Sequence, residues 1–463
     1  MSNISFFRRM VIVMAMVFLM NGAGALARGT EGGGSPTEPG VKTSSDTPEP
    51  TSYLQDFLTR EKLTGDWWGV REKLAKKGIA LDVDLTQVLQ GNVSGGGHFQ
   101  KDLRDPWGGE PENHTLYQGH TSYTLSLDFQ KMGLWPGAFV KIMGETQYGN
   151  NLLPYAGTML PVNSNALYPL PNQSKTTLSE VLFAQFFSKT FGVLIGKFVT
   201  TSGDRNVFAY DEKTTFLNCG LLYNPVYFRT CPYSALGAGF MWLPTSAVTF
   251  SFNALDSEGV PNTTGFKTVF HNGTTLASQL EVKTHFFDKP GDLVFGGSWS
   301  NKTYNSLQQD PRLILEHIIL GTPLATDKHS WCVYHNFSQF FYVREGTKDQ
   351  GIGIFGRFGV GEAETNPINY HIAFGIGGKG MSACRPNDRF GIGYYYTRLS
   401  DKLPSVLFKR GIIQNYEAGG EIFYNVALTP WLQVTPSVQL IESGIQKNNS
   451  MATVLSLRTQ IYF

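Results

Sequence analysis

The sequence has little charge and no long apolar run beyond its N-terminal region. Of its 463 residues, 16% are charged, against roughly 25% in a typical soluble protein. Past the N-terminus no stretch approaches the roughly 20 consecutive apolar residues of a transmembrane helix. The formal net charge of +1, without a basic stripe, gives no support for a nucleic-acid partner. These absences exclude a helical membrane protein and argue against a protein that binds nucleic acid.

Motifs of catalysis and metal binding are also lacking. The nine histidines form neither an HExxH motif nor a Cys-His zinc framework. Glycine-rich runs such as Gly375-Ile376-Gly377 lie in strand-like sequence with no helix after them, so they do not indicate a nucleotide-binding loop. We therefore expect no enzyme, no cofactor and no metal site.

What the sequence does have is 13% aromatic residues, 51 glycines and an N-terminal export signal. Arg8 and Arg9 precede the apolar run MVIVMAMVFLM, and Ala25-Leu26-Ala27 offers the small residues that a signal peptidase reads. We expect a signal peptide over residues 1–27. The alternative, a membrane-anchoring helix, needs a longer run than these 11 or so apolar residues.

Two short regions follow before the main domain. Residues 28–52 are rich in Gly, Pro, Ser and Thr and have almost no large apolar side chain, which predicts a flexible leader. Residues 53–79 are expected to form a short periplasmic helical segment. Its pattern GDWWGVREKLAKKGI can be capped by Thr64 or Asp66 and ended by Gly78.

From residue 80 to residue 463 the apolar period is two, as in strands. In LDVDLTQ, YTLSLDFQ and VTFSFNA, apolar residues alternate with polar ones. We expect about 16 strands, beginning near Ala80, Thr121, Gly137, Ser179, Phe191, Gly237, Ala247, Ser278, Asp292, Ser330, Gly351, Asn369, Phe390, Glu417, Trp431 and Thr453. A soluble sandwich would show the same alternation, so the period alone leaves both folds open.

The connections and the last strand favour a membrane barrel. Short turns such as GLWPG and SKT mostly alternate with long segments, as expected when one set of turns faces the periplasm and the other faces outward. The chain ends in the amphipathic strand VLSLRTQIYF with Phe463 at its carboxyl terminus. Trp135, Trp242, Trp331 and Trp431 fall near predicted strand ends, as interface girdles require. The predicted fold is an all-β, antiparallel outer-membrane barrel with a short N-terminal periplasmic helix.

Several long blocks resemble the carbohydrate-selective porins of the OprB family. The blocks are LTGDWWGVREKLAKKGIALDVDLTQ, GIGIFGRFGVGEAETNPINYHIAFGIGGKG with RFGIGYYYTRLS, and YEAGGEIFYNVALTPWLQVTPSVQLI. The leader before Tyr53 and the four cysteines have no match in the family pattern. The resemblance implies passive uptake of monosaccharides such as glucose through the outer membrane of a Gram-negative bacterium. The alternatives are a barrel enzyme of the protease or lipase type and a plugged, sugar-binding surface protein.

Residues that select a sugar are expected on the polar faces of the strands. Sugar hydroxyls pair well with arginine and carboxylate groups, and sugar C-H faces stack on aromatic rings. The candidates are Lys141, Glu145, Lys197, Asp204, Arg205, Arg357, Glu421 and Asn425. The segment that holds Lys197, Asp204 and Arg205 is expected to fold inward. For each charge the alternative is a wall residue solvated by pore water. We predict that neutralising two of Lys141, Glu145, Arg357 and Glu421 changes sugar selectivity more than stability.

The four cysteines allow one specific prediction. Export places them in an oxidising compartment, and Cys219 and Cys231 both lie in the long segment after the fifth strand. We predict that these two form a disulfide. Cys332 and Cys384 would lie on opposite sides of a hydrocarbon core roughly 30 Å thick, so they are expected to be unpaired. Four unpaired thiols remain the alternative, because spacing does not fix connectivity.

The expected surroundings are outer-membrane lipid and lipopolysaccharide. Apolar stripes continue around all the predicted strands, so no contact face between subunits stands out. A homotrimer is therefore an open expectation.

Overall fold

The computed structural model describes residues 52–96, 114–166, 175–404, 413–444 and 450–463. The predicted signal peptide and almost all of the predicted leader lie outside the described residues. The chain divides into two units, the first ending at Thr59 and the second running from Arg60 to Phe463. In the first unit, α2 (Tyr53–Thr59) is a short helix without a buried side chain.

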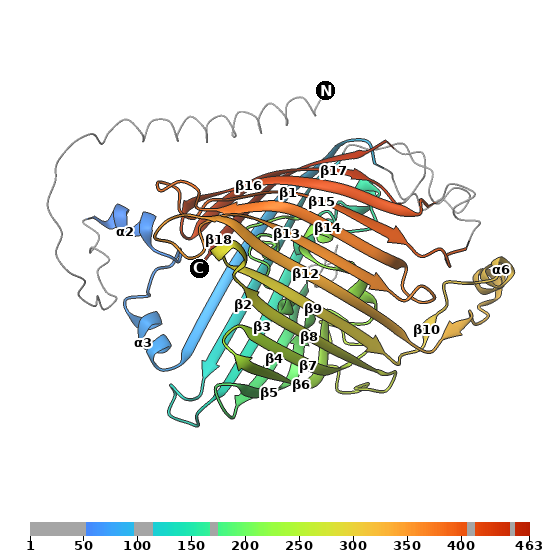
Figure 1. Ribbon diagram of the computed structural model, residues 1–463, viewed down its shortest axis with the longest axis horizontal. Coiled ribbons are helices and arrows are strands. Elements are labelled where there is room, and N and C mark those ends of the chain that lie inside the picture. The colour runs from blue at the N-terminus through green and yellow to red at the C-terminus, as the bar shows by residue number, and fades with distance from the viewer. Residues whose placement is uncertain (1–51, 97–113, 167–174, 405–412, 445–449) are drawn as a thin grey trace. The chain divides into compact units, whose positions relative to one another are not determined.

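The second unit contains a closed barrel of 16 antiparallel strands (Figure 1). The strands are β1 Ile79–Ser94, β2 Thr115–Asp128, β3 Ala138–Gly149, β4 Lys175–Phe186, β5 Phe191–Val199, β6 Ser234–Thr245, β7 Val248–Asp256, β8 Thr274–Thr284, β9 Gly291–Ser300, β12 Ser330–Val343, β13 Gly351–Gly361, β14 Ile368–Lys379, β15 Arg389–Leu399, β16 Tyr416–Thr429, β17 Leu432–Glu442 and β18 Ala452–Tyr462. Each strand pairs with its sequence neighbours in the barrel, and β1 pairs with β18 to close the ring. The predicted fold class and strand number are confirmed.

The wall is apolar outside and mostly polar inside, as the period of two requires. On β16, Ile422 and Tyr424 are 54% and 47% exposed, whereas Glu421 and Asn425 on the other face are buried. Trp135, Trp242 and Trp331 are exposed, as expected for an interface girdle. The prediction for the fourth tryptophan is wrong, because Trp431 is buried.

A helix is attached to the end of the barrel where the chain terminates. In α3 (Val70–Lys76), Arg71 donates a hydrogen bond to the carbonyl of Phe463 at 2.9 Å. Gly78 follows the helix with φ of 82°, and a Cβ there would lie 2.4 Å from the carbonyl oxygen of Asp128. Glycine therefore permits the turn from α3 into β1. Both α2 and α3 lie in the predicted helical segment.

The remaining elements lie in the connections. They are α4 Leu153–Ala156, η1 Ser164–Ala166, η2 Thr200–Gly203, α5 Cys219–Leu222, η3 Pro225–Arg229, η4 Phe286–Asp288, α6 Pro311–Leu320 and the small pair β10 Tyr304–Asn305 with β11 Thr326–Asp327. Within the described ranges, every helix is too short or too polar to cross a membrane.

Candidate functional site

Two connections turn back and pack against the inner face of the wall. The short inward segment (residues 150–166) places Leu152, Ala156 and Val162 against Ile441 and Val454 of the wall. The long inward segment (residues 200–233) follows β5 and packs against β12 to β15 through η3 and α5. The segment expected to fold inward held Lys197, Asp204 and Arg205; the part with Asp204 and Arg205 does so, whereas Lys197 belongs to the wall strand β5.

Buried charges on the wall hold the long inward segment by its backbone. The carboxylate of Glu421 accepts hydrogen bonds from the N–H groups of Leu217 and Asn218 at 2.8–3.0 Å. The guanidinium of Arg458 donates to the carbonyl oxygens of Glu212 and Thr215 at 2.6 and 2.7 Å. Glu421 is 2% exposed and Arg458 is fully buried. Glu421 therefore anchors a loop and is covered from the pore.

Arg357 on β13 has the same anchoring role. Its side chain is fully buried and forms an ion pair with Asp204 of the long inward segment. It also donates to the carbonyl oxygens of Leu221 at 3.0 Å and Ala209 at 2.5 Å. Asn336 of β12 donates to the same Asp204 carboxylate at 2.9 Å. The network fixes the backbone immediately before Arg205.

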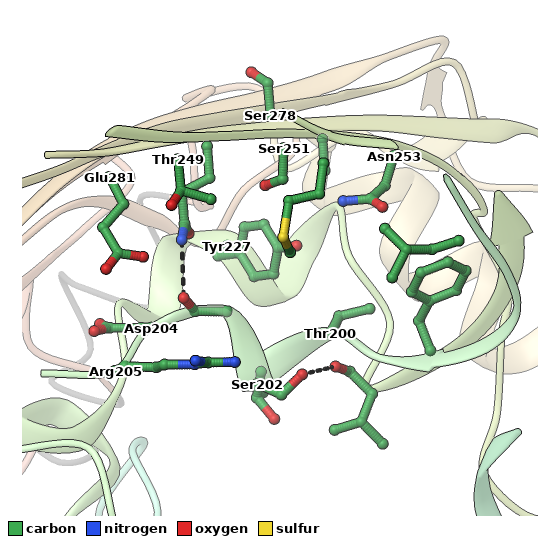
Figure 2. A pocket seen from close by; sticks show the side chains of 18 of the residues that line it. Thr200, Ser202, Asp204, Arg205, Tyr227, Thr249, Ser251, Asn253, Ser278 and Glu281 are labelled. Carbon is green, nitrogen blue, oxygen red and sulfur yellow. Dashed lines mark hydrogen bonds between the residues drawn. The ribbon is translucent and has the colours of Figure 1, made fainter. Parts of the chain in front are cut away.

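A cavity of about 640 Å³ remains on the other side of the lumen. Its walls come from β3 to β8, from β12 and from the long inward segment; among the described residues that line it, none belongs to β13–β18. Figure 2 shows Thr249, Ser251, Asn253 and Glu281 on one side of this cavity, across from Ser202, Asp204 and Arg205.

The charges around the cavity balance. The lining includes three acidic and three basic side chains, namely Glu180, Asp204, Glu281, Lys141, Arg205 and Lys283. Lys141 forms an ion pair with Glu180 at 2.6 Å, and Asp204 is engaged by Arg357. Among the described residues, the side chains of Arg205 and Glu281 have no hydrogen-bond or ion-pair partner, although the backbone of Glu281 is paired within the sheet. Their hydrogen-bonding groups are therefore available to a solute.

Aromatic rings complete the cavity. Tyr227 and Tyr334 form an edge-to-face pair with ring centroids 5.8 Å apart, and Tyr223 and Phe228 form another at 5.7 Å. All four residues line the cavity. Edge-to-face pairs hold their rings in a fixed orientation, so the cavity presents preformed apolar surfaces beside its charged groups.

Glu145 lies in an adjoining cavity of about 270 Å³. Its carboxylate accepts the hydroxyl of Tyr233 at 2.9 Å and contacts the ring of His120 at 3.2 Å. Glu212 lines the same cavity, and burial raises the pKa of its carboxyl group. The hydroxyl of Tyr223 donates to Glu212 at 3.3 Å. Because Glu145 is only 4% exposed, its contacts are chiefly with the protein.

The structure does not bring Lys197 and Asn425 to the main cavity. The ammonium group of Lys197 donates to the carbonyl oxygens of Leu178, Pro261 and Thr263 at 2.7–3.0 Å, and neither Lys197 nor Asn425 lines the cavity. Asn425 is fully buried and donates to Thr435 at 2.8 Å.

Several lining residues were missed from the sequence. Glu281 and Lys283 lie on β8, where Gln279, Glu281 and Lys283 alternate with Leu280 and Val282. This alternation is the same signal that selected Lys141 and Glu145. It could therefore have identified Glu281.

The structure also separates the two cysteines predicted to pair. No disulfide joins any of the four cysteines in this structure, and Cys384 alone is exposed. Cys219 lies at the start of α5 near Glu417 and Arg357, whereas Cys231 follows η3 and lies near Cys332. The prediction of a Cys219–Cys231 disulfide is corrected, because α5 and η3 lead the two residues to different parts of the wall.

A closed antiparallel barrel with an apolar outer face and a polar cavity defines a membrane channel of the porin class. Comparison with known proteins gives the family. The pattern described as "Carbohydrate-selective porin, OprB family" matches residues 112–463, and the chain belongs to this family.

Individual relatives agree with this assignment. Porin B of Pseudomonas aeruginosa is 22% identical over 437 residues, which cover 86% of this chain and 90% of that protein. The high-pH structure of Pseudomonas putida OprB has a TM-score of 0.73 at 21% identity, with 88% of this chain and 99% of that chain covered. The low-pH structure of the same protein has a TM-score of 0.54 at 16% identity, with the same coverage. The solved structures support the fold.

The protein is thus an outer-membrane porin that passes carbohydrates, and nothing favours the enzyme alternative. The family consists of passive channels, which catalyse no reaction on their solutes. Within the described residues, no group of three or more His, Cys, Asp or Glu side chains is arranged to hold a metal ion.

Proposed function

We propose that the 640 Å³ cavity is the sugar-selective part of the pathway and that it takes monosaccharides such as glucose. Its volume lies within the roughly 300–1,000 Å³ typical of small-molecule pockets. A single sugar ring with some of its water fits this space. The balanced charges around the cavity favour a neutral solute over an anion or a cation.

The observation that carries this proposal is that Arg205 and Glu281 face the cavity from opposite sides with their side chains unpaired (Figure 2). The guanidinium offers a fork of N–H donors and the carboxylate offers acceptors, so together they can bind neighbouring sugar hydroxyls. Tyr227 and Tyr334 add ring surface for the C-H face of the sugar. Water also solvates Arg205 and Glu281 when no sugar is present, so binding stays weak enough for release, as a channel requires.

The neighbouring charges then have separate roles. Lys141 and Glu180 satisfy each other at 2.6 Å, so they shape the cavity more than they bind its content. Asp204 is a positioning residue, because its contacts with Arg357 and Asn336 hold the backbone that carries Arg205. Glu145, Arg357, Glu421 and Asn425 act through the packing of the inward segments and the wall.

The test is sugar permeation through Arg205→Gln and Glu281→Gln channels. We expect the glucose concentration that half-blocks the ion current to rise about tenfold in each variant, which corresponds to about 1.4 kcal/mol. The matched controls are Lys348→Gln and Glu345→Gln, which make the same charge changes in the exposed turn between β12 and β13. Glucose block equal to that of the controls in both variants would show that this pair does not bind sugar.

For the surroundings, we propose that outer-membrane lipid and lipopolysaccharide contact the exposed apolar side chains of the outer wall. Such side chains include Ile195, Phe295, Phe374 and Ile392. The homotrimer remains a prediction, which chemical cross-linking in native membranes tests.

A further inference from the structure

Two of the four cysteines lie beside each other, and they are not the pair that the sequence suggested. Cys231 lies near the end of the long inward segment, and Cys332 lies near the start of β12. Both are 1% exposed. Trp331 and Val333, on either side of Cys332, are exposed on the outer wall, so the side chain of Cys332 points inward, toward the segment that holds Cys231.

One serine hydroxyl links the two sulfur atoms. Ser298 of β9 pairs directly with Cys332 in the sheet, and its Oγ lies 3.1 Å from the Cys332 sulfur. The hydroxyl of Thr230 lies 2.6 Å from the Ser298 hydroxyl and 3.9 Å from the same sulfur. The Cys231 thiol also lies beside both hydroxyls and beside Cys332. The two thiols therefore flank a single hydroxyl group.

We propose that Cys231 and Cys332 form a disulfide in the exported protein, which ties the end of the long inward segment to β12. The two thiols are oxidised by a disulfide-bonded partner of the periplasm. One cysteine thiolate attacks that disulfide and forms a mixed disulfide, and the second thiolate displaces the partner. The partner leaves as a dithiol and takes up the two electrons and two protons, while the S–S bond forms here.

The order of events follows from the burial of the thiols. Burial raises the pKa of the Cys231 thiol to about 12, so almost none of it is thiolate in the folded barrel at neutral pH. Disulfide exchange requires a thiolate on an accessible sulfur. The bond therefore forms during passage through the periplasm, before the long inward segment packs against the wall, and in the folded state it is shielded from reductants.

The position of the bond matters for the cavity. Tyr227 lies in η3, four residues before Cys231, and its carbonyl oxygen accepts a hydrogen bond from the Cys231 N–H at 3.1 Å; Tyr334 follows Cys332 by two residues on β12. These two tyrosines form the edge-to-face pair at the cavity wall. The disulfide fixes the segments that carry both rings. This inference does not depend on a role of Arg205 in sugar binding.

Peptide mapping of the purified, full-length protein tests the pairing. The protein is unfolded without reductant in the presence of iodoacetamide and then digested. We expect one peptide that joins Cys231 to Cys332, lighter than the two separate peptides by two hydrogen atoms, with Cys219 and Cys384 alkylated. Alkylation of both Cys231 and Cys332, or a peptide that joins either of them to another cysteine, would overturn the proposal.

A denaturing gel provides a second measurement that does not require the variants to fold. The unfolded wild-type chain should migrate faster without reductant than with it, because the bond closes a long loop. Cys219→Ser and Cys384→Ser should keep this shift, and Cys231→Ser and Cys332→Ser should each lose it. A shift that persists in Cys231→Ser would contradict the assignment.

Discussion

Replacing Arg357 should destabilise the barrel far more than removing an exposed charge. In Arg357→Met, the Asp204 carboxylate loses its ion-pair partner, and the carbonyl oxygens of Leu221 and Ala209 lose a donor. Breaking a buried ion pair from one side costs roughly 3–5 kcal/mol, and each orphaned buried acceptor costs about 1–3 kcal/mol. These costs are not additive, and the Asp204 side chain is still 15% exposed. We therefore expect a loss of about 3–6 kcal/mol.

The assay is denaturant unfolding of the protein refolded in phospholipid vesicles, followed by tryptophan fluorescence. Lys379→Met is the matched control, because Lys379 at the end of β14 pairs with Asp349 in the turn between β12 and β13, and their side chains are 20% and 60% exposed, whereas Arg357 is fully buried. Exposed pairs contribute at most about 1 kcal/mol. The double variant Arg357→Met/Asp204→Asn should recover part of the loss, because the unpaired carboxylate is gone. If Arg357→Met is no less stable than Lys379→Met, the anchoring role is refuted.

Two further predictions concern burial and backbone conformation. Burial raises the pKa of Glu212 above its ordinary value of 4.5, so the stability that its protonated carboxyl group contributes is present below pH 4.5 and is lost as pH rises through the folded pKa. The melting temperature measured from pH 4 upward should therefore fall less in Glu212→Gln than in wild type. Parallel curves for the two proteins would contradict this reasoning. Gly78→Ala should lower the melting temperature more than Gly133→Ala. Both glycines have positive φ, but only at Gly78 would the added Cβ meet a backbone atom, the carbonyl oxygen of Asp128. Equal losses in the two variants would show that this contact is relieved at little cost.

The strands were predictable because their signals are local. Alternating side chains and short turns are encoded within a few residues, so the predicted starts at Phe191, Ser330 and Gly351 coincide with β5, β12 and β13. The start of β2 was placed six residues late, at Thr121 instead of Thr115. Its first residues, TLYQGH, contain a glycine and do not alternate apolar with polar side chains.

The contents of the barrel were only partly predictable, because they depend on contacts between distant residues. The inward direction of Arg357 and Glu421 was predicted correctly from alternation. However, an inward side chain meets pore water only where no segment covers it, and residues 200–233 cover both of these. The prediction that neutralising such charges acts mainly on selectivity is therefore replaced, for Arg357 and Glu421, by an expected loss of stability.

Lys197 and Glu281 illustrate the two opposite errors. The sequence predicts that Lys197 turns inward with its segment, but carbonyl groups of residues 261 and 263, far along the chain, enclose its ammonium group. Glu281 was overlooked although its strand carries the required alternation. Glu281 differs from the buried charges of the wall because the long inward segment lies across the cavity from it and leaves its side chain uncovered. The sequence of β8 alone does not encode this arrangement.

The one-sided filling of the lumen has a consequence for how such a channel can change. Substitutions on the inner faces of β13 to β18 disturb buried anchors and are constrained by folding. The inner faces of β6 to β8 mostly meet an open cavity, where a new side chain alters the solute environment at little structural cost. We expect new solute preferences, whether evolved or engineered, to arise first along β6 to β8, while the opposite half of the barrel serves as a conserved scaffold.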